Sequence, residues 1–93
     1  MPYVMVKQKV VDYARWKTIF DADDANREIG GSKGGQLFRS ADDPNEVVML
    51  FEWDLEQARQ FSQSEALRAK MQEAGVLGPP EIYFLEEIEQ LSR

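Results

Sequence analysis

Hydrophobic residues recur with the spacing of β-strands in four short stretches of the chain. Residues 3–10 are rich in valine and contain no turn-forming residue, which predicts a first strand. Residues 36–41 and 46–53 predict two further strands, and the Asp-Asp-Pro-Asn sequence at 42–45 is typical of a tight turn. Residues 81–89 predict a fourth strand. The second and third strands should therefore form a hairpin.

Helical spacing appears after the first strand. Asp12 can cap a helix here, because its side chain can accept a hydrogen bond from the first free backbone N–H groups. Gly30-Gly31 should end this helix, since glycine adopts the left-handed conformation that ends helices. We expect the buried side of the helix to consist of Tyr13, Trp16, Phe20, Ala22, Ala25 and Ile29.

A second helical stretch follows the third strand. Asp54 can cap it, and a break near 62–64 is expected because Ser64 can act as a fresh cap. Gly75 should end it. The apolar positions along this stretch are Leu55, Ala58, Phe61, Ala66, Leu67, Met71 and Ala74.

The element order is β-α-β-β-α-β, which is the ferredoxin-like plan of an α+β domain. Right-handed crossovers place both helices on one face of a four-stranded antiparallel sheet. The 93 residues suit a single domain spanning 1–93.

The predicted strands are apolar on both faces. In the third strand, one alternating set contains Val47, Met49, Phe51 and Trp53, and the other contains Val48 and Leu50. The fourth strand has Ile82, Phe84 and Ile88 on one side and Tyr83 and Leu85 on the other. A face exposed to water would show polar alternation instead. A homodimer formed through the second sheet face would bury these residues, whereas the alternative is a monomer with a few exposed hydrophobic residues.

Composition narrows the chemistry. The net charge of −6 disfavours nucleic acid and anionic membrane surfaces as partners. The chain contains neither cysteine nor histidine, which excludes Cys-His and Ser-His-Asp mechanisms and removes the commonest metal ligands. We therefore expect no metal site. No signal sequence or long apolar run is visible, so a cytoplasmic location is expected.

The strand Val-Val-Met-Leu-Phe-Glu-Trp at 47–53, followed by Asp54, Ala58, Phe61, Ser64 and Leu67, resembles the antibiotic biosynthesis monooxygenase superfamily. The resemblance implies a dimeric α+β barrel with a ligand cavity between the helices and the sheet of each subunit. The superfamily includes cofactor-independent monooxygenases that act on aromatic polyketides, haem-degrading enzymes and other enzymes of small molecules. The haem-degrading branch carries a histidine ligand on the second helix, and this chain has none. The resemblance thus favours a protein without a cofactor.

Aromatic residues are the candidates for substrate binding: Trp16, Phe20, Trp53, Phe61 and Tyr83. The alternative is that they only form the core. Gln8 could donate a hydrogen bond, and Arg39 could meet a substrate anion or pair with Asp42 and Asp43. Glu52 could act as a base if it were buried, or form an ion pair. No catalytic residue can be assigned.

Two other motifs have ordinary interpretations. The Gly-Gly-Ser-Lys-Gly-Gly sequence at 30–35 follows a helix and precedes a strand, the reverse of a phosphate-binding loop. Asp21, Asp23 and Asp24 could hold a cation but are typical of an exposed helix face. Two functions remain open. One is a cofactor-independent oxygenase of a small aromatic substrate, and the other is a non-catalytic dimeric module that binds a small ligand or serves as a structural partner.

Overall fold

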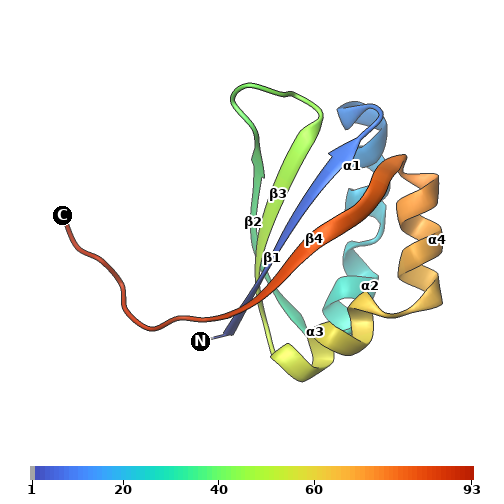
Figure 1. The fold of residues 1–93 in the computed structure, drawn as a ribbon. Helices are drawn as coiled ribbons and strands as arrows, with labels where there is room; N and C mark the ends of the chain where they lie inside the picture. Colours follow the sequence, from blue (N-terminus) through green and yellow to red (C-terminus); the bar gives the residue numbers. More distant parts are fainter. Residues whose placement is uncertain (1) are drawn as a thin grey trace.

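Four antiparallel strands form one sheet, and helices cover one of its faces, in a computed structural model that describes residues 2–93 (Figure 1). The sheet order is β2-β3-β1-β4, as the ferredoxin-like plan requires, and this confirms the predicted fold class. The strands are β1 (Pro2–Val10), β2 (Ser32–Arg39), β3 (Glu46–Trp53) and β4 (Val76–Glu86).

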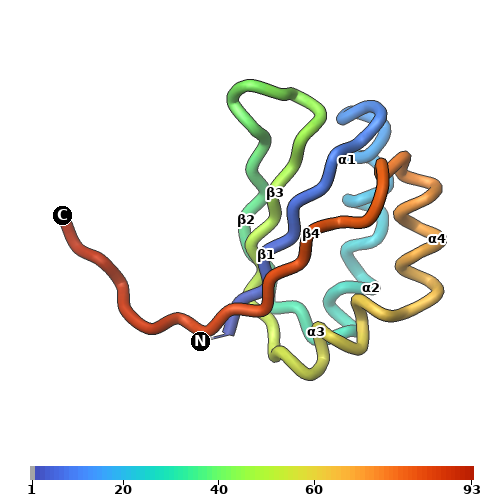
Figure 2. The backbone as a smooth tube through the Cα atoms, in the orientation of Figure 1, coloured from blue at the N-terminus to red at the C-terminus, as the bar shows by residue number. Residues whose placement is uncertain are grey.

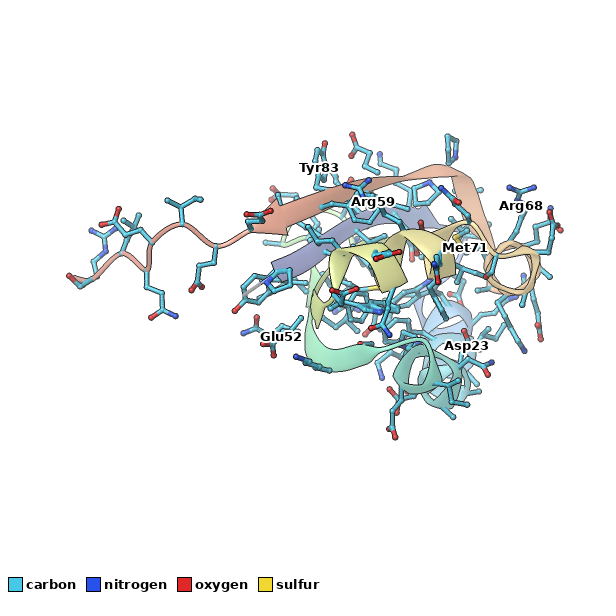
Figure 3. The ribbon with its side chains drawn as sticks, turned by 90° about the horizontal axis from the view of Figure 1, so that it is seen from below. Asp23, Glu52, Arg59, Arg68, Met71 and Tyr83 are labelled. Carbon is cyan, nitrogen blue, oxygen red and sulfur yellow. The ribbon has the colours of Figure 1, made fainter. Side chains whose placement is uncertain are left out.

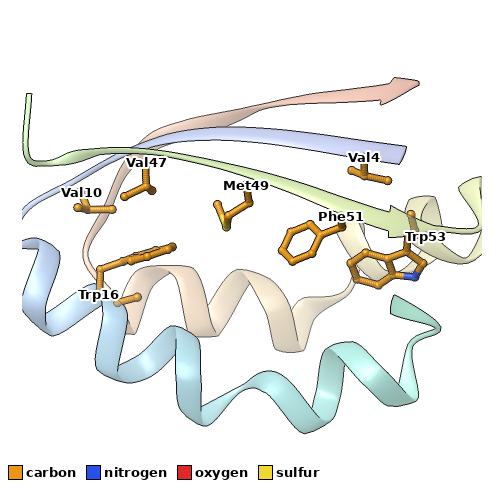
Figure 4. Close-up of a cluster of buried hydrophobic side chains, with 9 residues drawn as sticks. Val4, Val10, Trp16, Val47, Met49, Phe51 and Trp53 are labelled. Carbon is orange, nitrogen blue, oxygen red and sulfur yellow. The ribbon is translucent and has the colours of Figure 1, made fainter. Parts of the chain in front are cut away.

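The central strand β3 shows which apolar set faces the helices. Val47, Met49, Phe51 and Trp53 are buried and point from the sheet toward the helical layer (Figure 4). Burial of each such side chain is worth about 1.5–3 kcal/mol, so this row is a main source of stability. The other set, which includes Val48 and Leu50, lies on the face of the sheet that carries no helix within the described residues, here called the open face.

The first helical stretch is divided into α1 (Tyr13–Ala22) and α2 (Asp24–Ile29). Asp12 caps α1 as predicted, because its carboxylate accepts a hydrogen bond of 2.9 Å from the backbone N–H of Arg15. The chain departs from helical geometry at Asp23, where φ is −92° and ψ is 5°. The prediction of one continuous helix was therefore wrong.

The buried side of this stretch also differs from the prediction. Ala22, Ala25 and Ile29 are exposed, and Ile29 retains 83% of its accessible surface. Asp23 and Arg27 are buried in their place. The reason is helical periodicity, since positions seven and eleven residues after Trp16 return to the same side of a helix, and positions 22, 25 and 29 do not.

The second helical stretch divides where the sequence predicted, into α3 (Leu55–Ser62) and α4 (Glu65–Glu73). The Asp54 carboxylate accepts a hydrogen bond of 3.1 Å from the backbone N–H of Gln57 and caps α3. The Ser64 hydroxyl accepts one of 3.2 Å from the backbone N–H of Leu67 and caps α4. Both capping predictions are confirmed, and α3 and α4 cover the same sheet face as α1 and α2 (Figure 1).

The edge strands have different limits from those predicted. β2 begins at Ser32 and contains an irregularity between Ser32 and Gly35, where Gly34 has a φ of +95°. β4 begins at Val76 and ends at Glu86. Residues 87–93 leave the sheet as an extended segment (Figure 2), so Ile88 lies beyond β4 and is 90% exposed. The prediction that Ile88 belongs to the last strand, on the same side as Ile82 and Phe84, was wrong.

Candidate functional site

An apolar cavity of about 100 Å³ lies between the helix-covered face of the sheet and the helices. Its aromatic wall consists of Trp16, Phe20, Phe51, Trp53 and Phe61. The rings follow one another at centroid distances of 4.8, 6.4, 5.6 and 5.0 Å in that order, with Trp16 and Phe20 stacked. Sheet and helices thus bring together flat side chains that are distant in the sequence.

Four of the five predicted substrate-binding residues belong to this wall: Trp16, Phe20, Trp53 and Phe61. Tyr83 does not. It projects from β4 on the open face and is 45% exposed, whereas Met71 lies on the helical side (Figure 3). Tyr83 neighbours Phe84 in the sequence, and alternation along a strand sends these two side chains to opposite faces. Phe51, which was not among the candidates, completes the wall.

Gln8 gives the cavity a polar group. Its side chain is buried, and its Oε1 accepts a hydrogen bond of 3.2 Å from the indole N–H of Trp16. Its Nε2 donates to the thioether sulfur of Met71 at 3.5 Å. A thioether is a weak acceptor. A ligand oxygen near Met71 would therefore receive a stronger hydrogen bond from the same amide.

Trp53 is held in place by the connection that follows α2. Its indole N–H donates a hydrogen bond of 3.0 Å to the backbone carbonyl of Gly30. A side chain at Gly30 would meet the Phe61 ring at 2.7 Å, and Gly31 has a φ of +104°, which favours glycine. The double glycine therefore allows close approach of the chain to the aromatic wall.

Asp23 and Arg27 also line the cavity, and the prediction that Asp23 lies on an exposed helix face was wrong. The Asp23 carboxylate accepts a hydrogen bond of 2.6 Å from the Asn26 side chain. Arg27 lies over Phe20, with its guanidinium carbon 3.8 Å from the ring centroid, and its Nη1 donates a hydrogen bond of 2.9 Å to the Phe20 backbone carbonyl. The helical spacing 16, 20, 23, 27 was the signal that could have revealed both.

Burial lowers the pKa of Arg27 from its ordinary value. The carboxylates of Asp24, Asp23 and Asp21 act in the opposite direction but do not offset the loss of water. Asp24 is the ion-pair partner, at 3.4 Å, but its own side chain is 76% exposed. The nearby carboxylates therefore only partly compensate the guanidinium at the cavity wall for its loss of water.

The remaining polar candidates lie elsewhere. Glu52 is half-buried on the open face and does not line the cavity (Figure 3). Arg39 is exposed, with its guanidinium carbon 4.6 Å from the centroid of the Tyr13 ring. An ion pair of Arg39 with Asp42 or Asp43 is not found among residues 2–93. Neither residue can contact a ligand in the cavity from these positions.

In the part of the chain that the structure describes, no group of three or more acidic side chains is arranged so that it could hold a metal ion. The same region has no helix that is both long and apolar enough to cross a bilayer.

No protein-family model and no curated protein matches the chain. Solved structures do match its fold. SnoaB, a cofactor-independent oxygenase from Streptomyces nogalater, superposes with a TM-score of 0.77 at 16% identity, over 99% of this chain and 97% of that chain. An antibiotic biosynthesis monooxygenase matches with a TM-score of 0.68 at 14% identity, over 96% and 100%.

Rv0793 from Mycobacterium tuberculosis matches with a TM-score of 0.68 at 15% identity, over 99% and 100% of the two chains. Together these matches show that the chain has the fold of antibiotic biosynthesis monooxygenase-like proteins, as its resemblance to them implied. Sequence identities this low support a shared fold but not a shared reaction.

Proposed function

We propose that the chain is a cofactor-independent oxygenase that acts on a small aromatic substrate held in the cavity. The observation that supports this most is the wall of five aromatic residues around the cavity. The Gln8 side chain, which also lines the cavity, supplies an amide that can donate a hydrogen bond. Its fold is also that of SnoaB, which is described as a cofactor-independent oxygenase.

The cavity volume favours a single ring. Cavities of roughly 150 Å³ accept benzene, whereas drug-sized ligands need about 300 Å³ or more. The 100 Å³ found here is close to the first value, and the flexible Met71 side chain lines it and can move. A hydroquinone is therefore a better fit than a polycyclic substrate.

In the proposed reaction, a hydroquinone loses a phenolic proton and the electron-rich anion reacts with O2. One oxygen atom stays on the ring to give a hydroxyquinone, and the other leaves as water with two of the substrate's hydrogens. The Gln8 amide donates a hydrogen bond to the phenolate oxygen and stabilises its charge. Asp23 is the carboxylate among the lining residues, so it is the group assigned to receive the proton.

Oxygen uptake with a panel of hydroquinones tests this function. Wild type should consume O2 and place one atom of 18O2 in the quinone product. Asp23→Asn, whose amide oxygen can still accept the hydrogen bond from Asn26, should lower kcat about 100-fold or more. Uptake equal to that of the protein-free reaction across the panel would contradict the oxygenase.

The alternative is a non-catalytic module that binds a small aromatic ligand. The observation that favours it is the small size of the cavity, whose polar lining is limited to a few side chains. Calorimetric binding of hydroquinones without protein-dependent O2 uptake would support this alternative, and uptake would exclude it.

We also propose that two copies of the chain pair through the open face. Its apolar residues come from all four strands and include Met5, Phe38, Val48, Leu50, Tyr83 and Leu85. Phe38 is 50% exposed and Leu85 is 39% exposed. Such contiguous apolar surface marks an interaction site.

The two lysines of the open face have carboxylate partners on neighbouring strands. Lys7 lies 3.7 Å from Glu46 and 3.9 Å from Glu81, and Lys9 lies 3.9 Å from Glu46. They are paired within the chain. Light scattering should give twice the chain mass of 10.7 kDa at micromolar concentration, and a mass of one chain would contradict the dimer.

A further inference from the structure

A second hollow opens beside the cavity, between α2 and the irregular start of β2. This groove has a volume of about 570 Å³ and is lined by both charged and apolar side chains. Lys33, Gly34 and Gly35 form one side of it, and Asp24, Arg27 and Glu28 form the other. The glycine-rich segment that lacks the geometry of a phosphate loop thus becomes the wall of a surface groove.

The groove and the cavity share three lining residues: Phe20, Arg27 and Phe51. The two spaces are therefore neighbours, and a ligand that occupies both must pass these side chains. Phe20 and Phe51 offer ring faces to its apolar part. Arg27 is the charged side chain of the three, so the junction between the apolar and polar spaces carries a guanidinium.

The surroundings of Arg27 leave it suited to bind an anion. Its described hydrogen bonds use Nη1, toward the Phe20 carbonyl at 2.9 Å, and Nη2, toward Asp24 at 3.4 Å. The Asp24 contact is long and Asp24 is mostly exposed, so the pair is weak and its carboxylate can turn into water. The cost of burying the Arg27 cation is offset only in part by the nearby carboxylates, and a bound ligand anion would supply further negative charge beside it.

Other charges face the same space. Asp23 and Glu28 are acidic, whereas Lys33 and, at the cavity, Lys70 are basic. Asp23 is already engaged by the Asn26 amide at 2.6 Å. A guanidinium can bind a carboxylate through two parallel N–H groups, which an ammonium group cannot do. The anion-binding role therefore belongs to Arg27.

We propose that the substrate is a single-ring aromatic acid, with its ring in the cavity and its carboxylate bound by Arg27 at the mouth of the groove. This inference rests on the proposed function of the cavity and names its substrate class. It makes Arg27 a specificity-determining residue, because a ring without the acid would occupy only the apolar space.

Calorimetric titration with 2,5-dihydroxyphenylacetate and its neutral amide tests the proposal. Wild type should bind the acid about ten- to a hundredfold more tightly than the amide. Arg27→Gln should remove this preference while keeping affinity for the amide. Arg39→Gln is the matched control, because that arginine also lies over an aromatic ring but lines neither space, and it should bind as wild type does.

A second variant keeps the test independent of any loss of folding at Arg27. Asp24→Asn leaves the guanidinium in place and removes its exposed partner, so it should tighten binding of the acid about two- to fivefold and leave the amide unchanged. Equal affinity of wild type for acid and amide would overturn the role of Arg27 and leave the cavity function standing. Failure of both compounds to bind would overturn the cavity function and this inference together.

Discussion

At the scale of single residues, buried polar side chains decide what the cavity can bind. Gln8 is placed on β1 among valines, where an apolar residue would complete the row. Its carbonyl satisfies the buried indole N–H of Trp16, and its amide reaches into the cavity. The same side chain therefore links the packing of α1 on the sheet to the recognition of a ligand oxygen.

Replacing Gln8 with leucine should lower the free energy of unfolding by about 1–3 kcal/mol, because the Trp16 indole N–H would remain buried without its acceptor. Urea denaturation measures this change. Gln60→Leu, at an exposed position of α3, is the control and should change stability by less than about 0.5 kcal/mol. In the Gln8→Leu/Trp16→Phe double variant both partners are gone, and an energy equal to the sum of the single losses would contradict the coupling.

At the scale of elements, the helices are short and depend on their caps. α3 and α4 meet at 63–64, and the Ser64 hydroxyl holds the first turn of α4 through the backbone N–H of Leu67. Leu67 and Met71 on α4 both line the cavity. The cap thus fixes the direction of the helix that closes one side of the site.

Ser64→Ala should lower the free energy of unfolding by about 1 kcal/mol through loss of this cap. Thermal unfolding followed by circular dichroism measures the shift. Ser92→Ala, in the exposed segment after β4, is the matched control and should unfold at the wild-type temperature. Equal effects of the two substitutions would show that the cap is not needed.

Much of the fold could be predicted from local signals. Asp12, Asp54 and Ser64 act within three residues of themselves, so the sequence alone indicated the helix starts. The start of β2 was missed because Gly34 and its neighbours read as a loop, and only pairing with β3 makes them a strand. The strand propensity of single residues carries no information about this pairing.

The site was harder to predict than the fold. Four of the five aromatic candidates do belong to the aromatic wall of the cavity. The face that a strand residue occupies depends on register, so the sequence could not separate Tyr83 from the others. Asp23 was predicted to be exposed and Arg27 was not a candidate, because charged residues are usually exposed, and buried ones become recognisable only when their partners are known. The Asn26 amide and the Phe20 ring are those partners.

At the scale of the whole molecule, the two faces of the sheet have separate roles. The face that the helices cover (Figure 1) contains the core and the cavity, whereas the open face carries the apolar residues proposed to pair two copies. Met49 and Leu50 are neighbours on β3 but belong to different faces. Substitutions at these two positions can therefore separate folding from pairing.

Leu50→Glu should give a folded protein of single-chain mass, because the new charge lies on the open face. Met49→Glu should unfold the protein or lower its stability by several kcal/mol, because Met49 is 3% exposed in the core and the charge would have no partner. Light scattering and circular dichroism distinguish the outcomes. A Leu50→Glu variant that keeps the mass of two chains would show that pairing uses another surface.

The most direct test of the account is calorimetric titration of wild type and two phenylalanine variants with a hydroquinone. Leu67→Phe enlarges a half-buried side chain that lines the cavity, whereas Leu91→Phe makes the same change at a position that is 82% exposed. Wild type and Leu91→Phe should bind the ring saturably and with equal affinity, and Leu67→Phe should bind it at least about tenfold more weakly, a change of 1.4 kcal/mol. Absence of binding to wild type, or equal affinity in all three proteins, would contradict the claim that the space between sheet and helices is a ligand site.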